Sequence, residues 1–347
     1  MASPPDFASA SPGRRTVGIM SHVSGDLPTE DVYRATVSLA QAVENAGFEE
    51  FWIAQHHFSP NAGHVSSPFV FLAHLGAVVT KLTLGVGVVA LPFEDPIRLA
   101  EDIVTTEKLL GPRLRIGVGP GNPASRFDLF GITGEQRHAV FEEKYAELAA
   151  LLDPAAASDL ADGQLWPAPD PVRSRTLYQA TYTPERGRVI GERGLGLLLS
   201  ITHPSAGRGE GPATAGEGQR NIVDAYLEGL PAGVPPRITA TRAVHVTDSP
   251  RERDEVAAHA LALLGKVMGF TEPGALLEAL GVRHAVEATE ILGYSIGTAE
   301  HVRDRLEDDP AVAAATGVIF QNVTKDQTAW LDGVAALADV VVPALAV

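Results

Sequence analysis

Phe51-Trp52-Ile53-Ala54-Gln55-His56-His57-Phe58 is a short, mostly apolar segment that contains two adjacent histidines. Its aromatic and β-branched residues predict a buried strand, which ends at the histidines and is followed by a polar loop. In sheets built from β-α units, ligands bind at the carboxyl ends of the strands. His56 and His57 are therefore candidates for chemistry. The structural alternative is that one ring packs inward while the other is solvated.

The rest of the chain alternates predicted strands with predicted helices. Strands are expected at 16–20, 82–90, 114–118, 177–180, 195–200, 238–246 and 317–320, besides the histidine segment. Helices are expected from 29, 67 and 95, over 185–193 and 221–229, from 250 and 298, and over 330–342, with a less regular section from 122 to 176. This rhythm favours a (β/α)8 TIM barrel with loop insertions. A doubly wound open sheet is the alternative, although no Gly-x-Gly-x-x-Gly follows the first strand.

Two segments are expected to lie outside this regular pattern. Residues 1–14 are rich in Pro, Ser and Ala and are expected to form a disordered tail, which leaves 15–347 as a single domain. Residues 203–219 hold seven glycines or prolines. A loop of this length in a compact domain is expected to be mobile and is a candidate lid.

Charge and composition narrow the class of protein. The chain carries 27 Lys and Arg against 43 Asp and Glu, a net charge of −16, so nucleic acid and anionic membranes are not expected as partners. The absence of cysteine excludes disulfides, thiolate nucleophiles and Cys-ligated metal centres, and no metal site is expected. No apolar run reaches the length of a membrane span, and the first residues lack the pattern of a signal peptide. The expected location is the cytoplasm.

A series of short motifs runs from Trp52 to Gly131. In order they are Trp52-Ile53-Ala54-Gln55-His56-His57-Phe58, Ser67-Pro68, Leu84-Gly85, Leu91-Pro92, Asp95-Pro96-Ile97-Arg98-Leu99-Ala100-Glu101-Asp102, Gly117-Val118-Gly119-Pro120-Gly121 and Phe130-Gly131. Their order and spacing closely resemble the bacterial-luciferase-like flavin-dependent monooxygenase family, and weaker matches extend to 297–300. The resemblance implies a luciferase-like barrel that receives reduced FMN (FMNH2) from a separate flavin reductase. It also implies that O2 is the co-substrate and that a small organic molecule is oxygenated.

The resemblance leaves several functional details open. It implies a homodimer, and the weakly charged motif regions favour a hydrophobic substrate, with natural-product tailoring such as antibiotic biosynthesis as one setting. The segments 203–219 and 265–290 are candidates for a cover that keeps water away from the reaction. Two alternatives remain: a deazaflavin-dependent oxidoreductase of the same fold, and a non-catalytic flavin-binding protein.

The resemblance assigns roles to residues near the first three strands. His56 matches the catalytic histidine of the family, and an imidazole suits acid–base work because its pKa lies near neutral pH. His57 matches a neighbour that is more often structural. Gly87 and Val88 match a non-proline cis peptide under the flavin ring, with an ordinary strand glycine as the alternative. His22 follows the first strand, where a solvated loop histidine is the simpler interpretation and a pocket-lining role the other.

The phosphate site departs from the family pattern at Pro120. The family usually has an arginine directly after the glycine-rich fourth strand, and a proline ring cannot make the paired contacts of a guanidinium. Other cations are needed if a phosphate binds here. Arg126 is one candidate, with less support than those that follow.

The loop after the fifth strand supplies the better candidates for the phosphate site. Tyr182, Thr183 and Arg186 match the family's phosphate loop, just before a predicted helix whose free N–H groups suit an anion. Arg137 matches another phosphate contact. We therefore expect Arg137, Thr183 and Arg186 to hold the phosphate of FMN together. The structural alternative for each arginine is a solvated side chain paired with Asp or Glu.

Overall fold

The computed structural model describes residues 14–59, 62–122, 126–153, 165–170, 176–270, 272, 274–323 and 327–345. The expected N-terminal tail lies outside these ranges except for Arg14. The strands in these ranges are β1 (Thr16–Ser21), β2 (Glu50–Ile53), β3 (Thr83–Ala90), β4 (Leu114–Gly119), β5 (Leu177–Ala180), β6 (Gly196–Leu199), β7 (Ile238–Val246), β8 (Tyr294–Gly297) and β9 (Gly317–Asn322). The helices are α1 (Thr29–Asn45), α2 (Pro68–Val78), α3 (Pro96–Leu110), α4 (Arg137–Leu152), α5 (Pro184–Glu192), α6 (Ala215–Gly229), α7 (Pro250–Val267), α8 (Ala275–Leu280), α9 (Ala285–Ile291), α10 (Ala299–Glu307), α11 (Pro310–Ala314) and α12 (Gln327–Leu345).

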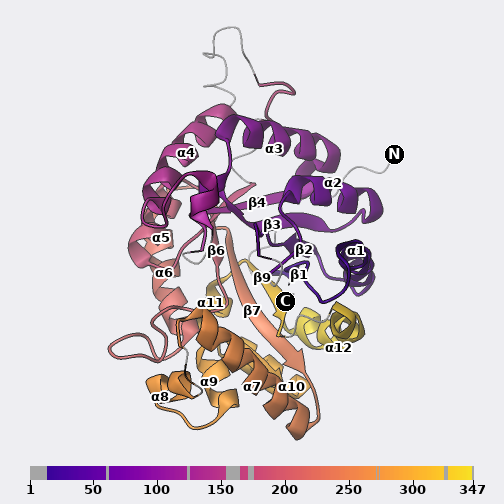
Figure 1. Cartoon of the computed structure of the whole chain (residues 1–347), viewed down its shortest axis with the longest axis vertical. Coiled ribbons are helices and arrows are strands. Elements are labelled where there is room, and N and C mark those ends of the chain that lie inside the picture. The colour runs from indigo at the N-terminus through magenta and orange to yellow at the C-terminus, as the bar shows by residue number, and fades with distance from the viewer. Residues whose placement is uncertain are drawn as a thin grey trace.

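Eight of the described strands close into a parallel barrel with helices around it (Figure 1). β1 to β6 pair in chain order, β9 pairs with β1, and β7 pairs with both β9 and β6. The predicted (β/α)8 barrel is confirmed, and the open-sheet alternative is wrong. β8 is not one of the eight: it pairs with Ala243–Val246 of β7, beyond the part of β7 that pairs with β6.

Several elements are missing from the sequence-based prediction, namely α4, α8, α9, α11 and β8, and two of them are instructive. The section 122–176, expected to be less regular, contains α4, whose buried side chains recur at helical spacing: Phe141, Tyr145, Leu148 and Leu152. The second element is β8, which precedes the predicted helix start at Thr298. A four-residue strand flanked by glycine carries too little periodicity to be distinguished from a loop.

Two predicted boundaries are also wrong. The loop expected at 203–219 ends at Thr214, because the Thr214 hydroxyl accepts a hydrogen bond from the N–H of Glu217 and α6 starts at Ala215 rather than near 221. The strand of the histidine segment ends at Ile53, so both histidines lie in the loop that follows β2. They still lie on the carboxyl side of the barrel.

Large side chains opposite glycines fill the barrel interior. Trp52 on β2 and Tyr178 on β5 meet edge to face, with ring centroids 5.7 Å apart. A Cβ at Gly85 would lie 2.3 Å from the ring of Trp52, and one at Gly196 would lie 2.2 Å from the ring of Tyr178. Glycine is therefore required at both positions by close packing. The interior is packed, and a ligand has room only at the rim, where barrel enzymes bind substrates.

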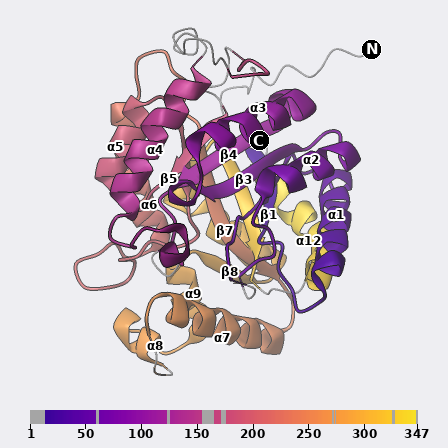
Figure 2. The ribbon, with the colours of Figure 1, turned by 45° about the horizontal axis from the view of Figure 1, so that its top comes forward.

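The helical shell carries an additional group of helices beside β7. α1 and α12 lie side by side, while α7, α8 and α9 form a group at one end of the molecule (Figures 1 and 2). This group has its own hydrophobic cluster, which contains Leu264, Leu280 and Leu292 together with the fully buried Ala206. Residues 203–214 are thereby anchored to the helical group. No helix in the described ranges is both long and apolar enough to cross a membrane.

Candidate active site

Gln55 fixes the loop that carries the two histidines. Its amide donates hydrogen bonds to the carbonyl of Ser66 at 3.2 Å and to Glu94 at 2.7 Å, and its Oε1 accepts from the N–H of Ala90 at 2.8 Å. The backbone N–H of His56 donates to the carbonyl of Val65 at 2.8 Å. The loop after β2 is therefore tied to the end of β3, and the position of His56 at the rim is set by the backbone.

His56 lies in a chain of side-chain hydrogen bonds that begins on the opposite end of the sequence. Its Nε2 is 3.0 Å from Nδ1 of His22, which follows β1, and Nε2 of His22 is 2.9 Å from Oε1 of Gln321 on β9. Gln321 in turn donates from Nε2 to the sulfur of Met20 at 3.1 Å. The simpler interpretation of His22, a solvated loop histidine, is wrong: its ring is half-buried and bonded at both nitrogens.

His57 has different surroundings from His56. Its ring packs edge to face against Phe93 and Phe130, with centroids 5.5 and 5.3 Å away, and its Nε2 is 4.0 Å from Glu94. Burial lowers the pKa of His57, although the nearby charge of Glu94 raises it. His57 therefore belongs to an aromatic cluster in which burial favours its neutral form, in line with the structural role expected for one ring of the pair.

Gly87 and Val88 form an irregularity in β3. The peptide bond between them is cis, as the resemblance led us to expect, and pairing with β4 shifts register between Val86 and Val89. Val88 packs with the cluster that fills the barrel interior, and a Cβ at Gly119 would lie 2.9 Å from it. The position beneath a flavin ring remains a prediction for this pair.

The expected phosphate loop leads directly into α5. Thr183 caps the helix, since its hydroxyl accepts from the N–H of Arg186 at 3.4 Å, and Tyr182 beside it is half exposed. Arg137 begins α4 and donates to the carbonyl of Gly134 at 2.8 Å. β5 is three strands away from β2 in the closed barrel, so this region faces the histidines across the mouth. The roles of these residues in binding remain predictions.

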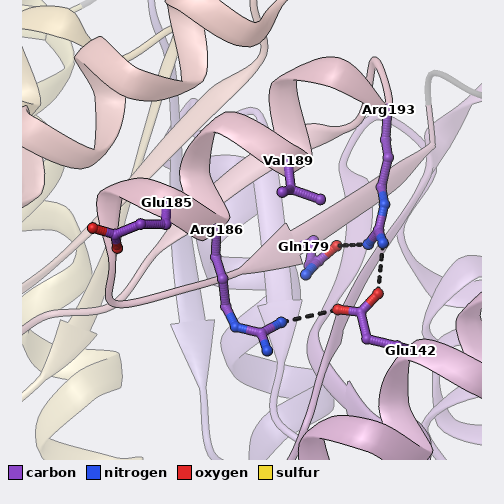
Figure 3. Close-up of a pocket in the computed structure, with 6 residues that line it drawn as sticks. All are labelled: Glu142, Gln179, Glu185, Arg186, Val189 and Arg193. Carbon is purple, nitrogen blue, oxygen red and sulfur yellow. Dashed lines mark hydrogen bonds and ion pairs between the residues drawn. The ribbon is translucent and has the colours of Figure 1, made fainter.

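A carboxylate of α4 joins Arg186 to a second arginine. Glu142 accepts from Arg186 at 2.9 Å and from Arg193 at 2.5 Å, and Arg193 also donates to Gln179 at 3.1 Å (Figure 3). These groups line a pocket of about 410 Å³ between α4, α5 and β5. Burial raises the pKa of Glu142, but the hydrogen bonds and charges of Arg193 and Arg186 outweigh it and hold that pKa below its usual range. In this structure Arg186 is thus neutralised by Glu142.

The charges of Arg137 and Arg186 both affect the pKa of His138. Burial lowers the pKa of His138, and the positive charges of Arg137 and Arg186 lower it further, whereas the negative charge of Glu142 raises it. The Nδ1 of His138 is buried and has no hydrogen-bond partner in the described part of the chain. We call the N-terminal ends of α4 and α5, which carry Arg137 and Arg186, the arginine side of the mouth.

Arg126 and Pro120 differ from Arg137 and Arg186 in what they contribute to the arginine side of the mouth. Arg126 forms a paired hydrogen bond with Asp128, at 2.9 and 2.7 Å, on the exposed surface, which is the alternative that the sequence analysis gave for it. Pro120 directly follows β4, where it offers no N–H. The positive charge on this side of the barrel comes from α4 and α5.

The sequence did not predict a role in the site for four residues: His22, His138, Glu142 and Gln321. Some of their partners lie far along the chain, since His22 and Gln321 are 299 positions apart. A polar glutamine at the end of a buried strand was the one signal that could have identified Gln321. Within the described ranges, no group of three or more His, Asp or Glu side chains is arranged to hold a metal ion.

Known proteins resemble this chain over about half to four fifths of its length. "Uncharacterized protein YwcH" of Bacillus subtilis is 27% identical, covering 82% of this chain and 86% of its own. Limonene 1,2-monooxygenase of Rhodococcus erythropolis is 29% identical over 48% of this chain and 45% of its own.

Among solved structures, monooxygenase RslO1 of Streptomyces bottropensis aligns with a TM-score of 0.75 at 18% identity, covering 94% of this chain and 99% of its own. The oxygenating constituent of 3,6-diketocamphane monooxygenase of Pseudomonas putida, in complex with FMN, has a TM-score of 0.69 at 14% identity and covers 96% and 98%. An F420-dependent secondary alcohol dehydrogenase has the same TM-score at 15% identity and covers 96% and 99%. At these identities the likeness establishes the fold. The model of the family described as luciferase-like monooxygenase matches residues 14–317, and the chain therefore belongs to that family.

Proposed function

We propose that the protein is a flavin-dependent monooxygenase that uses reduced FMN and O2 to oxygenate a small, apolar organic substrate. A separate reductase supplies the reduced flavin, and the working form is a cytoplasmic homodimer. The observation that carries the proposal is that His56 and the arginine side face each other across the carboxyl end of a barrel of this family. A tailoring step on a natural product fits the partial similarity to 4-hydroxyprotoasukamycin monooxygenase.

The arginine side has the donors that a phosphate dianion needs. Arg137 and Arg186 supply positive charge, the first turn of α5 supplies N–H groups and a helix dipole, and Thr183 supplies a hydroxyl. The partnerless, buried Nδ1 of His138 adds a polar atom that a bound anion or water would satisfy. These residues fit the phosphate of FMN once Arg186 exchanges Glu142 for it.

The bound flavin supplies the oxygen-activating chemistry, and the residues of the chain control protons and access. His56 would take up or deliver a proton at the rim, and Gly87 and Val88 would contact the flavin ring. His57 stays neutral and packs the floor of the loop. His203 lies against the backbone of Tyr182, so the anchored loop 203–214 borders the expected phosphate loop and is the candidate cover that keeps water out.

An aromatic surface on the histidine side suits an apolar substrate. Phe58 is 69% exposed and contacts Phe130, with ring centroids 6.0 Å apart. Phe130 stacks on Phe93 at 4.3 Å, and Leu129 beside it is half exposed. Exposed aromatic rings adjoining a catalytic rim are typical of sites that bind apolar ligands.

Rapid mixing tests the proposal and its main alternative. The protein is loaded anaerobically with photoreduced FMN and then mixed with oxygenated buffer, while absorbance and oxygen consumption are followed. We expect an oxygen-dependent absorbance change that precedes the return of oxidised FMN. The similarity to an F420-dependent dehydrogenase makes a deazaflavin the second candidate. Tight binding of F420 and its reduction by an added organic hydride donor, with no oxygen uptake from reduced FMN, would favour that candidate and reject the monooxygenase.

A further inference from the structure

The hydrogen-bond chain from Met20 to His56 has a defined direction. A thioether sulfur has no proton to give, so Nε2 of Gln321 is the group that faces Met20, at 3.1 Å. The amide oxygen of Gln321 therefore faces His22. Gln321 is buried, and its Cα pairs with that of Met20 across β9 and β1, so the sheet itself holds the amide in place.

This direction determines the protonation of both imidazoles. An amide oxygen only accepts, so Nε2 of His22 must carry the hydrogen that spans the 2.9 Å to Gln321. A neutral imidazole has one N–H, which leaves Nδ1 of His22 as an acceptor. The 3.0 Å bond between the histidines is then donated by Nε2 of His56. Neutral His56 consequently keeps its lone pair at Nδ1.

We propose that His22 and Gln321 are positioning residues that hold His56 in its Nε2–H tautomer, so that Nδ1 of His56 is the basic atom of the site. Proton uptake at Nδ1 gives an imidazolium whose Nε2–H bond to His22 becomes charge-assisted and stronger. The terminal group is an amide rather than a carboxylate, so the chain orients His56 without adding negative charge. The catalytic use of Nδ1 rests on the proposed function, whereas the tautomer does not.

The first test reads the tautomers directly in the flavin-free, full-length protein. Protein labelled with ¹⁵N-histidine is studied by two-bond ¹H–¹⁵N correlation at about pH 8, above the usual histidine pKa of about 6.5. Signals of the two residues are assigned from His22→Asn and His56→Asn variants. We expect Nε2–H patterns for both rings. A His56 that carries its proton on Nδ1 in the wild-type protein overturns the inference, whatever any variant does.

The second test changes the end of the chain. Gln321→Leu removes the acceptor, and we expect a measurable Nδ1–H population to appear in the His22 and His56 signals. Gln321→Glu keeps an acceptor oxygen and should retain the wild-type tautomers. An unchanged pattern in folded Gln321→Leu rejects the role of Gln321. If that variant does not fold, Gln321→Met, which keeps side-chain length without an acceptor oxygen, is measured in its place with the same criterion.

Measurements of kcat and FMN affinity then distinguish a failure of this inference from a failure of the proposed function. In Gln321→Leu we expect kcat for oxygenation to fall about tenfold, with FMN affinity unchanged within about twofold and with recovery in Gln321→Glu. Loss of FMN affinity equal to the loss of kcat would indicate a merely structural role and reject positioning. A wild-type protein that shows the expected tautomers but oxygenates nothing would reject the proposed function and leave the tautomer assignment standing.

Discussion

The two sides of the barrel mouth are held together in different ways. On the histidine side, His22, His56 and Gln321 are joined by side-chain hydrogen bonds. On the arginine side, Arg186 is held by ionic contact with Glu142, which also binds Arg193. On the arginine side, the carboxylate of Glu142 acts as the counterion of Arg186.

This difference indicates which property of the site should respond to substitutions on each side. Hydrogen bonds between side chains at strand ends are short-ranged and directional. They fix the orientation of the rings, and that orientation is lost when one member of the chain is removed. An ion pair whose partners are both 37% exposed contributes little to stability and can be exchanged for a better anion at small cost. We therefore expect substitutions on the histidine side to affect turnover, and substitutions on the arginine side to affect flavin affinity.

The largest effect is expected for His56→Asn. Removal of the imidazole eliminates the proton-transfer group, and general acid–base catalysis contributes about 10²- to 10⁴-fold, so product formation should fall by that factor. FMN affinity, measured by fluorescence titration, should stay within about twofold. His57→Asn is the matched control and should lose less than about tenfold. Equal losses in both variants would contradict the distinction between the two histidines.

The next effect is expected for Arg137→Ala and Arg186→Ala. A hydrogen bond to a charged group contributes about 1.5–3 kcal/mol, which corresponds to a loss of at least about tenfold in FMN affinity for each variant. Riboflavin, which lacks the phosphate, is the matched ligand, and its affinity should not change. Calorimetric titration with both ligands measures the difference. If both arginine variants bind FMN as the wild type does, the assignment of the phosphate to this side is wrong.

A smaller effect, of opposite sign, is expected for Glu142→Gln. The change removes the carboxylate that competes with a phosphate for Arg186, and exposed ion pairs are worth about 0.2–1 kcal/mol, so FMN affinity should rise by about 1.4- to fivefold. The gain should disappear when Glu142→Gln is combined with Arg186→Ala. Weaker FMN binding in Glu142→Gln alone would show that Glu142 positions the arginine and does not compete with the ligand.

Local sequence patterns were sufficient to predict the barrel and part of its site. Most strands are apolar runs whose signal lies within a few residues, and His56 belongs to a motif of fixed spacing. Helix α4 was predictable in the same way, from the spacing of Phe141, Tyr145 and Leu148, although the sequence analysis expected a less regular section there. Patterns of this kind record which face of an element is buried.

The sequence could not reveal the partners of these residues. His22 and Gln321 meet only because β1 pairs with β9, which closes the barrel through strands from opposite ends of the chain. Glu142 is one of 43 acidic residues, and nothing in its immediate neighbours distinguishes a carboxylate between two arginines from a solvated one. Long-range pairing and charge compensation follow from the closed fold rather than from local periodicity.

The smallest expected effect concerns the pH dependence of stability and distinguishes His57 from His56. Because the pKa of His57 is lower in the folded protein than in the unfolded chain, the unfolded chain binds more protons below about pH 6.5. The stability associated with neutral His57 is complete above that pH and decreases as the pH falls toward the folded pKa.

The melting temperature of the wild type should therefore decrease on acidification more than that of His57→Gln, by on the order of 1–2 °C. His138 and His203 have lowered pKa values as well and remain in both proteins, so the difference between the two curves isolates His57. Parallel curves in differential scanning fluorimetry from about pH 8 to about pH 5.5 would mean that His57 is not held neutral by its aromatic neighbours.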